Sequence, residues 1–341
     1  MRARDPDREG YAESAGVRIF WEEHGRGTHT ILCVPPWSIV HSRLFKMQVP
    51  YLARYFRVIT YDPRGNGRST RVTTGHDLDQ GAADALAVLD ATGTSRASLL
   101  CKSRSAWTGV LLAAQHAERV ERLVLIGAGL DEAPRGGARF HERRPRHDGW
   151  ERFNAHYWRE HYADFLEFFF AEAAPEPHST KIREDCVQWG LATTPEILIA
   201  TIDEYRCRTP LADLLVAVRV PTLLIHGYRR FVPDLYALLA ACDLAIVQGG
   251  LSTCMELTAA KRPFLYVPLR NHFEQNFHVR HRLAQYGAGT RMDYAQTDPD
   301  ALASAVADGL KRPVVYRDVD AEGARRAAAL LGSFLPGGVR P

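Results

Sequence analysis

The chain of 341 residues is predicted to be an α/β protein built on a parallel sheet covered by helices on both faces. Two observations predict this class. Apolar, strand-like runs alternate with helical runs along the first part of the chain, and strand signals return after a long helical segment. Because single cores stop growing at about 250 to 300 residues, the length also favours two units.

The first strand-like runs are residues 17–24 (VRIFWEEH) and 30–36 (TILCVPP), which Gly25 and Gly27 separate. Short apolar or β-branched runs joined by glycines are typical of a hairpin or of paired strands. The next run, 57–62 (RVITYD), leads into the turn-forming sequence PRGNGRS. A buried strand followed by a loop is expected there, with the polar residues of the turn shaping the loop.

Helices and strands then alternate. The segment HDLDQGAADALAVLDATG has apolar residues near helical spacing and ends at Gly93, and residues 97–103 (ASLLCKS) are again strand-like. The segment AWTGVLLAAQHAERV predicts a helix, and residues 121–129 (ERLVLIGAG) predict another strand. The order strand, helix, strand, helix, strand indicates parallel strands joined by helical crossovers.

Residues 133–210 are aromatic and charged, have a helical period and contain no good strand. They predict a helical cap over one end of the sheet, in which the aromatic residues 150–170 wall an apolar pocket. Strand signals return in three places, each after a helical run: residues 221–227, 242–250 and 262–269. We therefore expect one domain over residues 1–227 and a second over 228–341.

Composition excludes several classes of function. A net charge of +3, from 43 Lys and Arg against 40 Asp and Glu, provides no basic field for nucleic acid or for an anionic membrane. The charged N-terminus and the lack of a run of about 18 apolar residues predict no signal peptide and no spanning helix, so a cytoplasmic location is expected. The six cysteines have no metal-ligand spacing, and we expect them to be reduced and buried. No metal or cofactor is expected.

One serine stands where nucleophilic chemistry is favoured. The strand ASLLCKS is followed directly by a helix, which puts Ser103 on a sharp strand-to-helix turn. Such a turn exposes the hydroxyl, and the first N–H groups of the following helix face any negative charge that develops there.

With this turn, three further segments resemble the α/β-hydrolase family: YDPRGNGRS, LLAAQHAERVERLVLIGAG and VPTLLIHG. The resemblance covers about residues 11–227 and implies that Ser103 is the nucleophile of an ester hydrolase. The family pattern around this serine is G-x-S-x-G, whereas this chain has Cys101 and Ser105 at the two glycine positions.

The resemblance also implies an oxyanion hole made of two backbone N–H groups. Family members usually have His-Gly after the third core strand, whereas this chain has Pro35 and Pro36. Trp37 is then the first candidate donor, and Arg104, which follows the serine, is the second. The alternative for Trp37 is plain packing under the cap.

A nucleophilic serine needs a base, and the base needs an orienting acid. The family acid commonly follows PTLLIHG as G-x-x-D, but the chain has Gly227-Tyr228-Arg229-Arg230 there. Some relatives carry the acid after the preceding strand, where Asp131 stands, and a surface loop is the alternative for this residue. His272 follows a late strand and is the candidate base, with a role in donor binding as its alternative.

The rest of the chain, about residues 228–335, resembles the carboxyl half of the donor-binding domain of UDP-sugar and antibiotic glycosyltransferases. The strand CDLAIV ends in Gln248-Gly249-Gly250, and Leu251-Ser252-Thr253 open a helix whose N–H groups and hydroxyls would face a diphosphate. The resemblance implies that Glu256 holds the donor ribose and that the pair Glu274-Gln275 holds the donor sugar.

No acceptor domain and no first half of a donor domain are recognisable, and the junction lies near residues 227–233. Residues 242–269 would either complete the hydrolase sheet or form a separate domain. The preferred interpretation is a serine hydrolase that acts on a small ester. The alternatives are nucleotide-sugar binding or hexosyl transfer by the second segment, and an inactive chimera that acts as a binding protein. The oligomeric state stays open.

Overall fold

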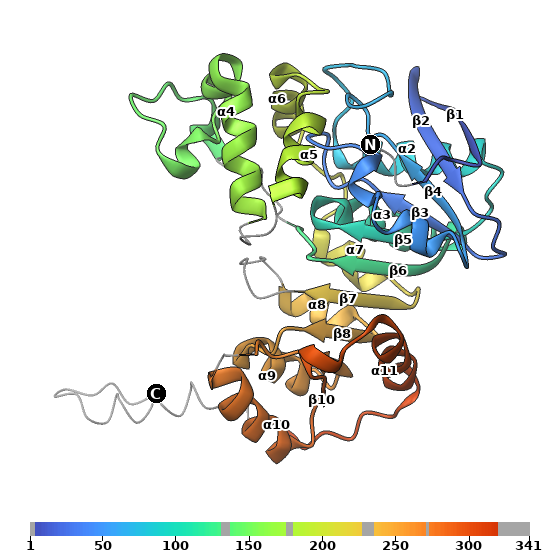
Figure 1. Cartoon of the computed structure of the whole chain (residues 1–341), viewed down its shortest axis with the longest axis vertical. Coiled ribbons are helices and arrows are strands. Elements are labelled where there is room, and N and C mark those ends of the chain that lie inside the picture. The colour runs from blue at the N-terminus through green and yellow to red at the C-terminus, as the bar shows by residue number, and fades with distance from the viewer. Residues whose placement is uncertain (1–3, 131–136, 175–179, 227–234, 271–272, 320–341) are drawn as a thin grey trace. The chain divides into compact units, whose positions relative to one another are not determined.

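The computed structural model describes residues 4–130, 137–174, 180–226, 235–270 and 273–319. They divide into two compact units, the first up to Leu223 and the second mainly from Leu238 onward. The division falls inside strand β7 (Thr222–His226). Figure 1 shows the chain with its elements labelled, and each unit is described below by itself.

The first unit contains a sheet with the strand order β1-β2-β4-β3-β5-β6. Strands β1, β2 and β4 pair antiparallel, whereas β4, β3, β5 and β6 run parallel to one another. The predicted α/β class with a mostly parallel sheet is confirmed. The strands are β1 (Arg8–Ser14), β2 (Val17–His24), β3 (Thr30–Val34), β4 (Arg57–Tyr61), β5 (Ala97–Lys102) and β6 (Val120–Ile126).

The predicted pairing of residues 17–24 with residues 30–36 is wrong. Strand β4 lies between β2 and β3, pairing antiparallel with the first and parallel with the second. The glycines between β2 and β3 serve close packing instead of a tight turn. A Cβ at Gly25 would lie 2.4 Å from the Phe56 carbonyl oxygen, and one at Gly27 would lie 2.2 Å from the Tyr55 carbonyl oxygen.

Strand β1 was not predicted from the sequence. It lies at one edge of the sheet and pairs along its whole length with β2. Its exposed positions carry charged side chains, such as Arg8, Glu9 and Glu13, while Ala12 and Ser14 are buried. Charges of this kind are common on edge strands, where they oppose pairing with another chain.

Helices follow the parallel strands as predicted. Helix α2 begins after Asp77, whose carboxylate accepts from the Gln80 N–H, and it ends just before Gly93. The 3₁₀ turn η2 (Ser103–Ser105) joins β5 to α3. The remaining helices and 3₁₀ turns of this part are η1 (Ser42–Phe45), α1 (Val49–Leu52), α2 (Leu78–Ala91), α3 (Ala106–Gln115), η3 (Ala117–Arg119) and α7 (Leu211–Ala217).

The described residues between 137 and 210 form a helical cap without strands, and Figure 1 shows α4, α5 and α6 grouped together outside the sheet. Helix α4 starts at a buried cap residue, Asn154, whose Oδ1 accepts from the N–H groups of His156 and Tyr157. Its backbone breaks from helical geometry at His161. The cap elements are η4 (Gly137–His141), η5 (Gly149–Arg152), α4 (Ala155–Ala173), α5 (Thr180–Gly190) and α6 (Pro195–Asp203).

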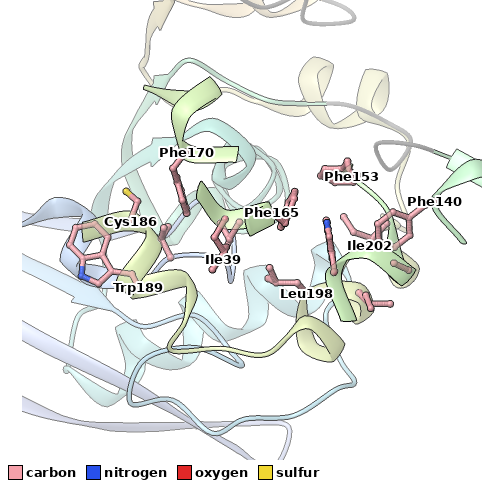
Figure 2. Close-up of a cluster of buried hydrophobic side chains, with 14 residues drawn as sticks. Ile39, Phe140, Phe153, Phe165, Phe170, Cys186, Trp189, Leu198 and Ile202 are labelled. Carbon is pink, nitrogen blue, oxygen red and sulfur yellow. The ribbon is translucent and has the colours of Figure 1, made fainter. Parts of the chain in front are cut away.

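The cap has an aromatic core of its own, which Figure 2 shows. Trp158 and Phe165 are fully buried, with ring centroids 4.5 Å apart, and Phe140 meets Trp158 edge to face at 5.0 Å. The aromatic residues of 150–170 were predicted to wall an apolar pocket. They instead pack largely against one another, because large rings gain most by mutual burial, and none of them lines the cavity described below.

The loop after β4 is held by one buried carboxylate. Asp62 Oδ1 accepts from the N–H and the hydroxyl of Ser42 at 3.1 and 2.6 Å, and Oδ2 accepts from the Arg68 N–H at 2.8 Å. Gly67 has a φ of +58°, and a Cβ there would lie 2.2 Å from Asp62 Oδ2. This carboxylate therefore shapes the loop, as the sequence predicts.

The second unit contains three parallel strands in the order β8-β9-β10. Helices stand between the strands, as expected of a Rossmann-like half-domain. The elements are α8 (Leu235–Ala241), β8 (Leu244–Val247), α9 (Leu251–Ala259), β9 (Phe264–Tyr266), the π-helical turn η6 (Glu274–Val279), α10 (Arg280–Tyr286), β10 (Thr290–Arg291), η7 (Tyr294–Gln296) and α11 (Pro299–Lys311).

Two further findings bear on the predictions. In the described part of the chain, no helix is both long and apolar enough to cross a membrane. The six cysteines are free, and all are buried except Cys207, which is half-buried. The prediction of reduced, buried cysteines is confirmed for five of the six.

We predict that Gly67→Ala destabilises the first unit strongly, because the new methyl group would overlap the Asp62 carboxylate. The matched control is Gly93→Ala, where φ is +66° but no atom lies within 4 Å of the new Cβ. In the control, alanine pays only the free-energy cost of a left-handed backbone, about 1–2 kcal/mol. The loss in the free energy of unfolding for Gly67→Ala should exceed that of the control by at least about 2 kcal/mol. Urea unfolding followed by tryptophan fluorescence measures both, and equal losses would contradict the prediction.

Candidate functional site

Ser103 occupies a strained turn between β5 and α3. Its φ is +57°, and only two other described non-glycine residues, Ala15 and Lys261, have a φ in the left-handed range. A serine in this region costs about 1–3 kcal/mol, and such strain often marks a functional site. The side chain is half-buried. The geometry that the sequence predicts for this serine, at the tip of a parallel strand before a helix, is present.

The first missing glycine of the family pattern is compensated by another glycine. Cys101 is fully buried on β5, and burial raises the pKa of its thiol well above the usual range. A Cβ at Gly109 of α3 would lie 2.7 Å from Cys101 Sγ. The room for the cysteine side chain therefore comes from Gly109.

The second missing glycine is replaced by a residue that clamps the turn. The Ser105 hydroxyl accepts from the Lys102 N–H at 2.7 Å and donates to the Lys102 carbonyl oxygen at 2.9 Å. From the other side, the Gly129 N–H donates to the Ser103 carbonyl oxygen at 3.0 Å. These bonds fix the backbone before and after the strained residue.

The two candidate oxyanion residues, Trp37 and Arg104, are both tied to Thr201 of the cap helix α6. Trp37 Nε1 donates to Thr201 Oγ1 at 2.7 Å, and Arg104 Nη2 donates to the Thr201 carbonyl oxygen at 2.8 Å. The Arg104 guanidinium also lies 4.3 Å from the centroid of the Tyr205 ring. Thr201, which the sequence analysis did not single out, thus connects the cap to both residues.

The side chain of Trp37 has a packing role. Its ring lies 5.7 Å from Phe169 and 6.2 Å from Trp158, measured between centroids. The alternative considered for this residue, packing under the cap, therefore describes its side chain. An oxyanion role would use only the backbone N–H, for which the described residues provide no hydrogen-bond acceptor. The two roles are compatible, and the second stays a prediction.

The predicted acid and base, Asp131 and His272, lie outside the described residues, so their assignment stays a prediction. Within the described part of the chain, no histidine or carboxylate is hydrogen-bonded to the Ser103 hydroxyl. Two histidines in the loops after β3 and β4 have other partners. His41 Nδ1 lies 3.7 Å from Asp62, and His76 Nε2 lies 2.8 Å from the Val72 carbonyl oxygen. Burial lowers the pKa of both imidazoles.

A cavity of about 90 Å³ lies beside the candidate oxyanion residues. Trp37 and Arg104 line it, together with Ser105 and Thr108, whereas Ser103 itself is not among its lining residues. The wall also includes the buried residues Tyr61, Arg64, His76 and Asp84 and the glycines Gly75 and Gly81. The loop that carries Arg64 was predicted from the sequence, whereas a cavity at this place was not.

The buried wall of this cavity holds a bidentate ion pair. Arg64 Nη2 and Nε donate to the two carboxylate oxygens of Asp84 at 2.7 and 3.1 Å. The same carboxylate accepts from the Ser14 hydroxyl at 2.6 Å and from Gln80 Nε2 at 2.9 Å. The charges of the pair are thereby balanced inside the protein, which is the condition for burying them.

In the second unit, the strand-to-helix turn after β8 has the predicted glycines. Gly249 has a φ of +99°, and Gly250 is the N-cap of α9 without any side-chain hydrogen bond to the helix. Ser252 is exposed and Thr253 is half-buried in the first turn. Unpaired N–H groups at such a terminus favour an anion.

The other predicted donor-binding residues differ in their surroundings. Glu256 is half-buried, and burial raises the pKa of its carboxyl group. Gln248 is half-buried and Glu274 is exposed. Gln275 is buried, and its Oε1 accepts from the Leu269 N–H at 2.9 Å. The oxygen of this amide therefore holds the loop after β9.

Each of these two sites lies in a segment that matches a known protein family. Residues 24–156 match the family model of the alpha/beta hydrolase fold, and residues 217–330 match that of the glycosyltransferase family 28 C-terminal domain. Both resemblances predicted from the sequence are therefore confirmed. No cluster of three or more His, Cys, Asp or Glu side chains suited to a metal ion occurs among the described residues.

Individual relatives match one segment each. A non-heme haloperoxidase of Rhodococcus erythropolis is 35% identical over 116 residues, which are 34% of this chain and 42% of the relative. An uncharacterized glycosyltransferase of Methanopyrus kandleri is 32% identical over 108 residues, 31% of each chain. The chain thus spans less than half the length of these curated relatives.

A solved structure shows the same fold. The esterase RhEst1 from Rhodococcus sp. ECU1013 superimposes with a TM-score of 0.56 at 20% identity, covering 89% of this chain and 98% of the esterase. At this identity, the similarity establishes the α/β-hydrolase fold.

We predict that Thr201→Val lowers the free energy of unfolding by about 1–3 kcal/mol, because Trp37 Nε1 loses its acceptor in a part-buried position. The tryptophan emission should shift as well. Thr209→Val is the control, since Thr209 accepts only an exposed bond from Gln115, and it should cost less than about 0.5 kcal/mol. Urea unfolding measures both variants, and equal small losses would show that Thr201 does not hold Trp37.

Proposed function

We propose that the first unit is a serine hydrolase that transfers the acyl group of a small ester to water, with Ser103 as the nucleophile. The observation that carries the proposal is the left-handed backbone of Ser103 at the junction of β5 and α3. Strain at a serine is maintained here by hydrogen bonds from Ser105 and Gly129. The similarity to an esterase structure supports the same class of reaction.

The reaction proceeds in two steps. The Ser103 oxygen attacks the ester carbonyl carbon, its proton passes to a base, and the alcohol leaves with a proton and the electron pair of the broken C–O bond. Water then attacks the acyl-serine and releases the acid. In both steps the N–H groups of Trp37 and Arg104 donate to the carbonyl oxygen as it gains negative charge. The sequence offers His272 as the base and Asp131 as its orienting acid.

The cap contributes by holding the oxyanion donors. Thr201 binds the Trp37 indole and the Arg104 guanidinium, so the loop after β3 and the turn after β5 are fixed to one point of α6. Preorganised donors stabilise an oxyanion because they need not reorient during the reaction.

We predict that a fluorophosphonate probe labels the wild-type chain at one site and that Ser103→Ala abolishes the labelling. The matched control is Ser98→Ala, a serine on the same strand β5 that is not at the turn, and it should be labelled like the wild type. Mass spectrometry of the labelled peptide identifies the residue. Unchanged labelling of Ser103→Ala, or none of the wild type, would contradict the proposal.

A second candidate function, favoured by the turn after β8, is binding of a nucleotide sugar by the second unit. Gly249 and Gly250 bring the backbone N–H groups of α9 to the end of a parallel strand, and Ser252 and Thr253 add hydroxyls. The match of residues 217–330 to a glycosyltransferase domain supports the same ligand class. In this function, Glu256 would hold the ribose, and Glu274 and Gln275 the sugar.

We predict that UDP raises the melting temperature of the full chain by a few degrees at a concentration well above its Kd, whereas uridine, without phosphates, does not. Thr253→Val should reduce the shift because it removes a hydroxyl near the helix terminus. The control Thr290→Val changes an exposed residue of β10 and should leave the shift intact. A chain that neither responds to UDP nor reacts with the fluorophosphonate would favour the non-catalytic binding protein.

A further inference from the structure

Two donors that face the cavity beside Trp37 and Arg104 have no acceptor among the described residues. Arg64 Nε and Nη2 both donate to the Asp84 carboxylate, and Nη2 also donates to the Ser14 carbonyl oxygen. Arg64 Nη1 has no hydrogen-bond acceptor in the described part of the chain. The Tyr61 hydroxyl likewise forms no hydrogen bond with any described residue. Both side chains are more than nine-tenths buried and line the cavity.

Charge neutralisation in the cavity wall selects against an ionic ligand. Arg64 is paired with Asp84, and Asp77 caps α2 by accepting from the Gln80 N–H. Arg104 is bonded to the Thr201 carbonyl oxygen and lies over the Tyr205 ring. An anion would compete with Asp84 for Arg64. A cation would face the hydrogen-bond donors Arg64 Nη1 and the Tyr61 hydroxyl, which cannot balance its charge. An uncharged ligand avoids both costs.

The volume of the cavity limits the part of a ligand that it can enclose. A cavity of about 150 Å³ holds benzene, so the volume here, about 90 Å³, accommodates only a few non-hydrogen atoms. A hydrocarbon of that size would leave Arg64 Nη1 and the Tyr61 hydroxyl buried without acceptors, which is costly. A group of the same size that carries an oxygen acceptor satisfies them.

We infer that this cavity receives the end of a short, uncharged acyl group, namely the three carbons and the hydrogen-bond-accepting oxygen beyond the carbonyl of a 3-hydroxybutyryl or 3-oxobutyryl group. Arg64 Nη1 and the Tyr61 hydroxyl donate to that oxygen. The inference rests on the proposed hydrolase function, because Trp37 and Arg104, the oxyanion donors of that proposal, line the same cavity. Burial, with the Asp84 charge as a smaller contribution, raises the pKa of Tyr61, so its hydroxyl keeps its proton.

The polarity of the cavity is tested with esters matched in length. Ethyl 3-hydroxybutyrate and ethyl acetoacetate should be hydrolysed with a kcat/KM at least tenfold above that of ethyl butyrate. Tyr61→Phe removes one donor and should reduce this ratio about tenfold, while Tyr51→Phe, an exposed tyrosine outside the cavity, should preserve it. A wild-type ratio near one, or a ratio that Tyr61→Phe does not change, overturns the inference.

The size limit is tested with Gly81→Ala. The new Cβ would enter the cavity wall at 3.5 Å from Thr108 Oγ1, which is ordinary van der Waals contact. Gly81 lies inside α2, where alanine is the better helix former, so the variant should fold. Its kcat/KM for ethyl 3-hydroxybutyrate should fall at least fivefold relative to that for ethyl acetate. Equal changes for both esters contradict occupation of the cavity.

A binding measurement separates failure of this inference from failure of the hydrolase proposal. The uncharged amides 3-hydroxybutyramide and butyramide need no catalysis, and only the first should raise the melting temperature of the wild-type chain. Tyr61→Phe should lose this shift. If the first amide binds but Ser103 is not labelled by the fluorophosphonate, the cavity is assigned correctly and the hydrolase proposal is wrong. If Ser103 is labelled but the two amides behave alike, the reverse holds.

Discussion

The strained backbone of Ser103 is the constraint on which the first unit is organised. A serine with a φ of +57° returns to an ordinary conformation unless its neighbours forbid it. Here Ser105 binds both polar groups of the Lys102 backbone, and the Gly129 N–H holds the Ser103 carbonyl oxygen. The first contact lies within the turn, and the second comes from the segment that follows β6. The position of the Ser103 hydroxyl therefore depends both on its own turn and on the segment that follows the neighbouring strand β6.

The cap is connected to the same turn through few atoms. Thr201 accepts from Trp37 with its hydroxyl and from Arg104 with its carbonyl oxygen, and its hydroxyl donates to the Leu198 carbonyl oxygen inside α6. The aromatic core of the cap packs on the Trp37 ring as well. A displacement of α6 would therefore move the loop after β3 and the turn after β5 together. Through Thr201 the cap is therefore tied to both residues that the sequence predicts as oxyanion donors.

Local features were predictable from the sequence, and contacts between distant segments were not. The run before Ser103 and the helix after it gave the strand-to-helix turn, because apolar periodicity and small residues are local signals. The pairing of residues 17–24 with 30–36 was wrong, because glycines can serve a turn or the close approach of another segment, and only the fold distinguishes the two. The bond between Trp37 and Thr201 joins residues 164 positions apart, and no periodicity reports such a contact. Asp131 and His272 stay predictions because both lie outside the described residues.

The close packing of Cys101 on Gly109 limits which residues can stand at these positions in related proteins. A Cβ at position 109 would lie 2.7 Å from Cys101 Sγ and 2.8 Å from Leu123 Cδ1, so a side chain cannot be added there while both neighbours are kept. A lineage that acquired the bulkier residue on the strand had to hold glycine on the helix at the same time, or gain it first. Related sequences that carry a side chain at the helix position should therefore have changed both at the position of Cys101 and at that of Leu123.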